Sequence, residues 1–126
     1  MKNLLWVCVG GAAGSGARYL IGLWTVEQLG KAFPWGTLAV NVAGCLLLGA
    51  LMRAGEKSAW MSPVVLLALT AGVMGGFTTY SSFNFEVFRL LQDGQARSAI
   101  AYVALTLGGG FLAGATGYGV ARAVVG

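Results

Sequence analysis

The sequence predicts an all-α membrane protein with four transmembrane helices in a single domain, residues 1–126. Of its 126 residues, 57% are hydrophobic and only 10% are charged. A water-soluble domain carries about 25% charged residues, so this composition indicates a chain that lies almost wholly in lipid. Because a helix needs about 20 residues to cross the hydrocarbon core, four spans use nearly the whole length.

The first two predicted spans cover residues 4–24 and 34–52. Gly10 and Gly14 form a small-residue pair in the first span that lets another helix approach closely. Lys2 before an apolar run imitates a signal peptide, but the run is longer than such a segment. Pro34 suits the first turn of the second span.

The third span, residues 62–91, is predicted to be broken near residues 75–79, whereas the fourth, residues 98–121, is predicted to be continuous. A Gly-Gly pair followed by four Ser/Thr residues competes with helical hydrogen bonding in the third span. Broken backbone at membrane depth is tolerated only where it is buried in protein or lines a water-filled cavity. The segment therefore favours a permeation pathway over a plain anchor.

Enzyme and nucleic-acid functions are excluded by what the sequence lacks. It contains no histidine, and its two cysteines lie singly within apolar spans, so no catalytic or metal-ligand pattern is present. The eight basic residues form no cluster. Apart from Arg18 within the first span, they divide almost evenly between the two ends of the spans: Lys2, Arg53, Lys57 and Arg122 on one side, Lys31, Arg89 and Arg97 on the other. With so little positive-inside bias, either counting is noisy or copies insert in both directions and pair antiparallel.

A few polar residues within the spans each have two interpretations. Asn41, with Thr37 one turn before it, either bonds a neighbouring helix or donates to an anion. Arg18 either carries a functional charge buried in the membrane or extends its side chain to the membrane–water interface. Glu86, three residues before Arg89, is expected to form a surface ion pair with it.

Taken together, these side chains fit a passive anion pathway better than a pump. Tyr102, Thr106 and Gly110 recur at helical spacing, which is typical of a packing seam or of a polar track. The groups able to help an anion are the amide of Asn41, the hydroxyls of Thr79, Ser81, Ser82, Tyr102 and Thr106, and the ring edges of Tyr80 and Phe83. Ring edges carry partial positive charge, and the sequence offers no central acid or histidine for proton coupling.

Three segments resemble motifs of the Fluc family of fluoride channels, also called CrcB, and the resemblance covers essentially the whole chain. They are GGAAGSGARYLIG (residues 10–22), GTLAVNVAGCLLLG (residues 36–49) and GVMGGFTTYSSFNFEVFRLL (residues 72–91). The resemblance implies passive export of fluoride across the cell inner (plasma) membrane. It also implies a dual-topology, antiparallel homodimer whose two pores are each lined by both protomers.

The resemblance also implies roles for single residues. Asn41 would line the pore, and Tyr80 and Phe83 would occupy the positions of two aromatics whose edges face fluoride. Gly75 and Thr78 would offer backbone carbonyls to a structural sodium ion (Na+) on the dimer axis. The remaining assignments are Arg18 and Thr37 to the vestibule and polar framework, and Tyr102 and Thr106 to the polar track, with Thr79, Ser81 and Ser82 beside it.

The sequence departs from the family pattern at two of these positions. Tyr80 stands where the family usually has phenylalanine, and Gly110 where a serine is often found, which leaves the track one hydroxyl short. One alternative function is a small multidrug-type transporter, which would need an acid within the first span where this chain has Arg18. Another is a noncatalytic assembly subunit whose polar residues only join helices.

Overall fold

The structure, a computed structural model, describes residues 1–59 and 61–126, and within them every regular element is a helix. The first, second and fourth spans are the helices α1 (Lys2–Leu29), α2 (Trp35–Lys57) and α6 (Ala96–Val125). The third consists of α3 (Pro63–Leu67), a π-helical segment η1 (Ala68–Met74), α4 (Gly75–Phe77) and α5 (Tyr80–Gln92). All four spans are long and apolar enough to cross a membrane, which confirms the predicted fold class and the broken third span.

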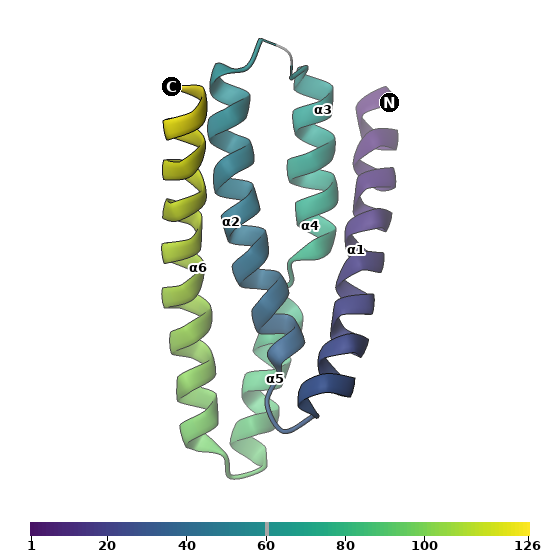
Figure 1. The fold of residues 1–126 in the computed structure, drawn as a ribbon. Helices are drawn as coiled ribbons and strands as arrows, with labels where there is room; N and C mark the ends of the chain where they lie inside the picture. The colour runs from purple at the N-terminus through teal and green to yellow at the C-terminus, as the bar shows by residue number, and fades with distance from the viewer. Residues whose placement is uncertain (60) are drawn as a thin grey trace.

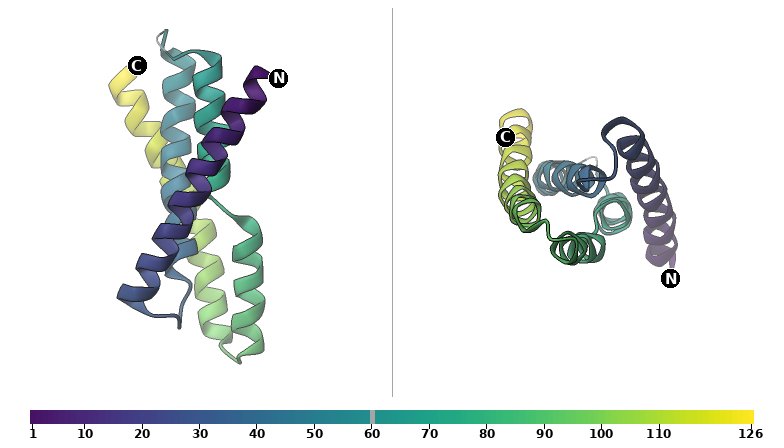
Figure 2. Two further views of the ribbon diagram at one scale, coloured as in Figure 1. Left: turned by 90° about the vertical axis from the view of Figure 1, so that its right-hand side faces the viewer. Right: turned by 90° about the horizontal axis from the view of Figure 1, so that it is seen from below.

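The spans run side by side, and both termini lie at the same end as the α2–α3 connection (Figure 1). The α1–α2 and α5–α6 connections lie at the opposite end. In the end-on view, α1 and α6 flank the molecule on opposite sides, with α2, α4 and α5 between them (Figure 2). Large apolar side chains such as Phe111 and Leu112 are exposed on the outside, as is typical of a surface covered by lipid or by another protein.

Helices α1 and α6 extend beyond the predicted spans. α1 continues past residue 24 to Leu29, where the N–H of Gly30 (φ 79°) donates to the Val26 carbonyl at 2.9 Å. α6 reaches from Ala96 to Val125 rather than from residue 98 to 121. The sequence marks where the apolar run ends, but a helix continues until its backbone is capped.

Glycines bring α1 into backbone contact with η1 and α4. A Cβ on Gly10 would lie 2.6 Å from the Ala68 carbonyl oxygen, and a Cβ on Gly76 would lie 3.0 Å from the Ser15 nitrogen. Real side chains do not fit at such distances, so the close approach predicted for Gly10 and Gly14 is confirmed. The contact with α1 thus holds the π-helical segment η1 in place. A π-helical distortion of this type is frequent at functional sites.

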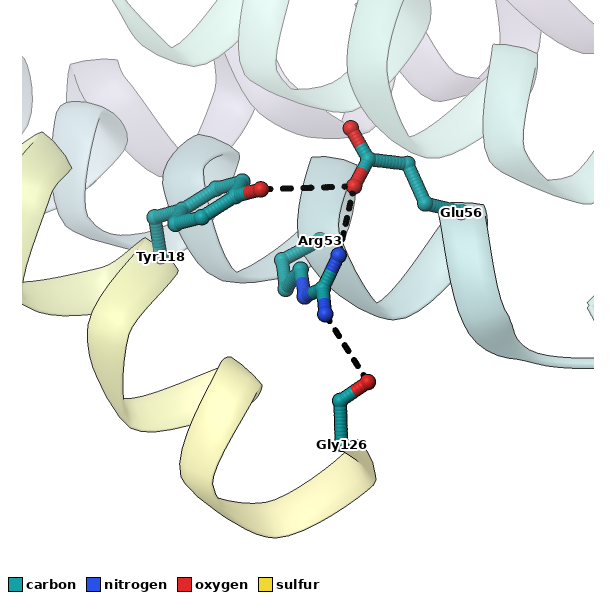
Figure 3. A network of polar contacts seen from close by, with 4 residues as sticks. All are labelled: Arg53, Glu56, Tyr118 and Gly126. Carbon is teal, nitrogen blue, oxygen red and sulfur yellow. Dashed lines mark hydrogen bonds and ion pairs between the residues drawn. The ribbon is translucent and has the colours of Figure 1, made fainter.

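At the end that carries the termini, Arg53 ties α2 to the last turn of α6 (Figure 3). Its side chain is 13% exposed, and it donates to Glu56 Oε2 at 3.0 Å and to the Gly126 carbonyl at 2.8 Å. The guanidinium also lies 5.5 Å from the centre of the Tyr118 ring. These contacts close one end of the seam between α2 and α6.

A candidate permeation site at the helix break

The third span is broken at Thr78 and Thr79, whose backbones are extended. Gly75–Phe77 is still helical, so the Gly-Gly pair lies beside the break, and its second member, Gly76, allows close contact with α1. Helix α5 restarts at Tyr80, because the Thr79 hydroxyl accepts from the Ser82 N–H at 3.2 Å as an N-terminal cap. The break thus falls within the predicted interval, and threonines set its position.

Asn41 on α2 holds the break in place. Its Nδ2 donates to the Thr79 carbonyl at 3.0 Å, and its Oδ1 accepts from the Thr79 N–H at 2.7 Å. The structural interpretation of Asn41 is therefore correct. A side-chain amide carries two N–H donors, and Thr79 takes one of them.

Arg18 supports the same segment from α1. Its Nε donates to the Gly76 carbonyl at 2.9 Å, and the side chain is half-buried. This bond satisfies a carbonyl beside the break, where the helical ladder ends. Arg18 is therefore turned toward α4.

The carbonyls of Gly75 and Thr78 are among those that lose their helical partners at the break. In an unbroken helix, the Thr79 N–H would donate to the Gly75 carbonyl and the Ser82 N–H to the Thr78 carbonyl. Here the first donates to Asn41 and the second to the Thr79 hydroxyl. The carbonyl oxygens of Gly75 and Thr78 are thereby released from the ladder.

A cleft of about 430 Å³ opens at the break, between α2 and α6. Five of the eight side chains predicted for an anion pathway line it: Asn41, Thr79, Tyr80, Phe83 and Thr106. Gly75, Thr78, Cys45 and Gly110 line it as well. Ser81, Ser82 and Tyr102 lie outside its lining, as do Arg18 and Thr37.

Hydroxyls and rings also cluster beside this cleft, at the start of α5. The Thr79 hydroxyl lies 3.3 Å from that of Ser81 and 3.2 Å from that of Ser82. Tyr80 is 76% exposed, so its ring stands at the surface of the protomer, 5.9 Å from the buried ring of Phe83. Phe83 in turn meets Tyr102 edge to face at 5.1 Å.

The side chain of Glu86 was assigned wrongly from the sequence. Its two carboxylate oxygens accept from the Thr37 hydroxyl at 2.7 Å and from the Tyr102 hydroxyl at 2.6 Å. In residues 1–59 and 61–126 the ion pair is Arg53–Glu56, not Glu86–Arg89. Three-residue spacing makes an ion pair possible, but Glu86 faces α2 and α6, where two hydroxyls satisfy it. Glu86 follows Phe83 by three residues, and this spacing was the signal in the sequence that could have placed the two on one face of the helix.

A second cavity, of about 450 Å³, lies toward the α1–α2 and α5–α6 connections. Thr37, Glu86, Lys31, Arg89 and Asp93 are among its lining residues. Phe83 lines the first cleft, and Tyr102 contacts both Phe83 and Glu86. Tyr102 therefore links a residue that lines the first cleft, Phe83, to one that lines the second cavity, Glu86.

A broken helix beside a cleft that Asn41, Thr79 and Thr106 line, within four apolar spans, is typical of a helical membrane transport protein. The family model described as "CrcB-like protein, Camphor Resistance (CrcB)" matches residues 5–118. The chain belongs to this family, as its three motifs predicted.

Curated relatives cover nearly all of the chain. A protein of Anaeromyxobacter sp. (strain K), named fluoride-specific ion channel FluC, is 51% identical over 109 residues, 86% of each chain. Proteins with the same name from Sorangium cellulosum (strain So ce56) and Rhizobium meliloti (strain 1021) are 46% and 43% identical over 125 residues. These alignments cover 99% of this chain and 98% and 100% of the relatives.

Proposed function

We propose that this chain is a fluoride-specific ion channel that lets fluoride leave the cytoplasm passively through the plasma membrane. Membership of a family whose relatives carry that name supports the ion. The observation that supports the route is the cleft at the break, where Asn41 and Thr106 offer polar groups and Tyr80 and Phe83 offer rings. Donors of this kind can replace the water that fluoride holds tightly.

Passive export follows from the chemistry of fluoride. The neutral acid crosses the membrane and ionises in a less acidic cytoplasm, where the anion is trapped. An inside-negative potential drives the anion outward by about 2.3 kcal/mol per 100 mV. A route of hydrogen-bond donors is sufficient for such a flux, and no coupled energy source is required.

The functional unit in this proposal is an antiparallel homodimer with two pores, each lined by both protomers. Tyr80 stands exposed at the mouth of the cleft, so a second copy seated there would cover the ring and complete the wall. The near-even division of basic residues between the two ends is compatible with insertion in both directions.

A sodium ion on the axis of that dimer fits the residues at the break. The carbonyls of Gly75 and Thr78 are released from the helical ladder, and unwound carbonyls are typical sodium ligands in membrane proteins. Two such oxygens from each protomer would hold the ion. Its positive charge would join the two breaks across the dimer.

Purified protein reconstituted alone into liposomes tests the proposal. We expect a fluoride electrode to record efflux that a potassium-valinomycin potential drives, with chloride retained. Absence of fluoride efflux, or equal passage of chloride, would overturn the proposed function. Uptake of a cationic drug coupled to protons would instead identify the multidrug-type transporter.

A further inference from the structure

The side chain of Cys45 on α2 lies over Gly110 on α6. A Cβ built on Gly110 would lie 3.4 Å from Cys45 Sγ, and no other atom outside the helix's own backbone would come within 4 Å. Both residues line the cleft at the break. A Cβ at position 110 would therefore be in van der Waals contact with the thiol.

This contact completes a row of polar groups along the cleft. On α6, Thr106 lines the cleft and Gly110 follows one turn later without a side chain. On α2, Asn41 lines the cleft and Cys45 follows one turn later. At the level of Gly110 the polar group of the wall thus comes from α2, and the hydroxyl missing from α6 is replaced by a thiol.

Thr106 independently indicates that the cleft takes a polar occupant. Its Oγ1 is buried, and it forms no hydrogen bond with any residue that the structure describes. A buried hydroxyl without a partner is costly and rare in native structures. Because Thr106 lines the cleft one turn from Gly110, an ion or water beside it would also lie beside the thiol.

We propose that Cys45 forms part of the wall of the fluoride pathway and is the site at which thiol-directed reagents close this channel. The inference rests on the proposed function. An S–H group is a weak donor, and it supplies the contact that Gly110 cannot. A group attached to Sγ would fill the cleft at that level.

Methylmercury is a suitable probe because it is small and its reaction with a thiol is simple. The cation CH3Hg+ replaces the thiol hydrogen: the S–H bond breaks, an S–Hg bond forms, and the proton passes to water. No electron is transferred, so no oxidant is needed. The nitrate salt avoids adding a second halide.

The chain has two cysteines, which makes a matched control available. Cys8 is exposed on α1, outside the cleft lining. We expect Cys8→Ser to conduct like the native chain and to lose efflux by at least about tenfold with methylmercury, because the modified sulfur overfills a packed wall. Efflux through Cys45→Ser, at whatever rate it runs, is expected to be insensitive to the reagent.

A second test moves the polar group of the wall from position 45 on α2 to position 110 on α6. It also provides a channel without Cys45 in case Cys45→Ser fails to fold. Gly110→Ser alone adds an Oγ beyond a Cβ that already contacts Sγ, and we expect this added atom to lower efflux by about tenfold through crowding. Cys45→Ala with Gly110→Ser removes the crowding and restores a hydroxyl. Its efflux should return to within about threefold of the native rate and resist methylmercury, as expected when the volume of the wall is conserved.

These outcomes distinguish a failure of the role of Cys45 from a failure of the proposed channel function. Block that depends on Cys45, with recovery in the double variant, supports it. Efflux that methylmercury leaves unchanged, or block retained without Cys45, overturns the role of Cys45 while the channel function stands. A native chain that passes no fluoride overturns both.

Discussion

The amide of Asn41 and the main chain of Thr79 exchange two hydrogen bonds, with Nδ2 donating to the Thr79 carbonyl and Oδ1 accepting from its N–H. This pairing gives the Thr79 N–H an acceptor in place of the Gly75 carbonyl that it loses at the break. One amide donor is left over. Asn41 can therefore fix the break and still offer an N–H to the cleft that it lines.

Substituting Asn41 should affect stability and conduction differently. Asn41→Ala removes both bonds, and we expect it to lower the free energy of unfolding by about 3 kcal/mol, since each unsatisfied buried group costs about 1–3 kcal/mol. Asn41→Asp retains the acceptor for Thr79 but places a carboxylate in the anion route. Its efflux should fall by about a hundredfold through like-charge repulsion.

Thermal unfolding in detergent and fluoride efflux from liposomes measure these two effects. Thr116→Ala is the control, since Thr116 is exposed and its hydroxyl bonds only the Leu112 carbonyl of its own helix. Native efflux through folded Asn41→Asp would argue against the assigned pathway.

The approach of α1 to the third span should not tolerate a methyl group at Gly14. A Cβ there would overlap the Val73 carbonyl oxygen and lie 2.8 Å from the Phe77 nitrogen. Backbone cannot move aside as a flexible side chain does, so Gly14→Ala should lower stability by at least about 2 kcal/mol. Gly16→Ala is a matched control because nothing lies within 4 Å of a Cβ at Gly16. Similar unfolding midpoints for the two variants would contradict the close contact.

The hydroxyls of Thr37 and Tyr102, which both donate to the Glu86 carboxylate, should each stabilise the fold. Hydrogen bonds to a charged group contribute about 1.5–3 kcal/mol, so Tyr102→Phe and Thr37→Val are each expected to lower the free energy of unfolding by about 2 kcal/mol. With Glu86→Gln already present, Tyr102→Phe should cost clearly less. A double-mutant cycle from unfolding midpoints measures the coupling. Strict additivity would mean that the Tyr102–Glu86 bond contributes nothing.

Arg53 should hold the last turn of α6 against α2. Loss of its bonds in Arg53→Gln is expected to raise amide exchange in residues 122–126 by about tenfold, as fraying termini open more easily once their tertiary contacts are lost. Lys57→Gln removes a nearby exposed charge and should leave exchange there unchanged. Hydrogen exchange with mass spectrometry compares the two. Equal protection in both variants would show that backbone bonds alone hold this end.

The cleft was only partly predictable from sequence. Asn41, Thr79, Tyr80, Phe83 and Thr106 were expected in one site and do line one cleft. Tyr102 was placed in the same track, but its hydroxyl is bound to Glu86, a residue that the sequence had assigned to a surface ion pair. Polarity within an apolar span identifies candidates, but it does not say which neighbour each one meets.

The amino-acid sequence by itself determined the four spans, the interruption of the third and the family, because apolar length, glycine-threonine composition and motif spacing are local properties. The tertiary structure alone decided that Arg18 reaches Gly76, that Glu86 turns to Thr37 and Tyr102, and that Cys45 covers Gly110. These contacts join residues on different helices. Which residues meet depends on the rotation of each helix about its axis and on how closely glycines allow neighbouring helices to approach. The helical periodicity of the sequence specifies neither the rotation nor the distance.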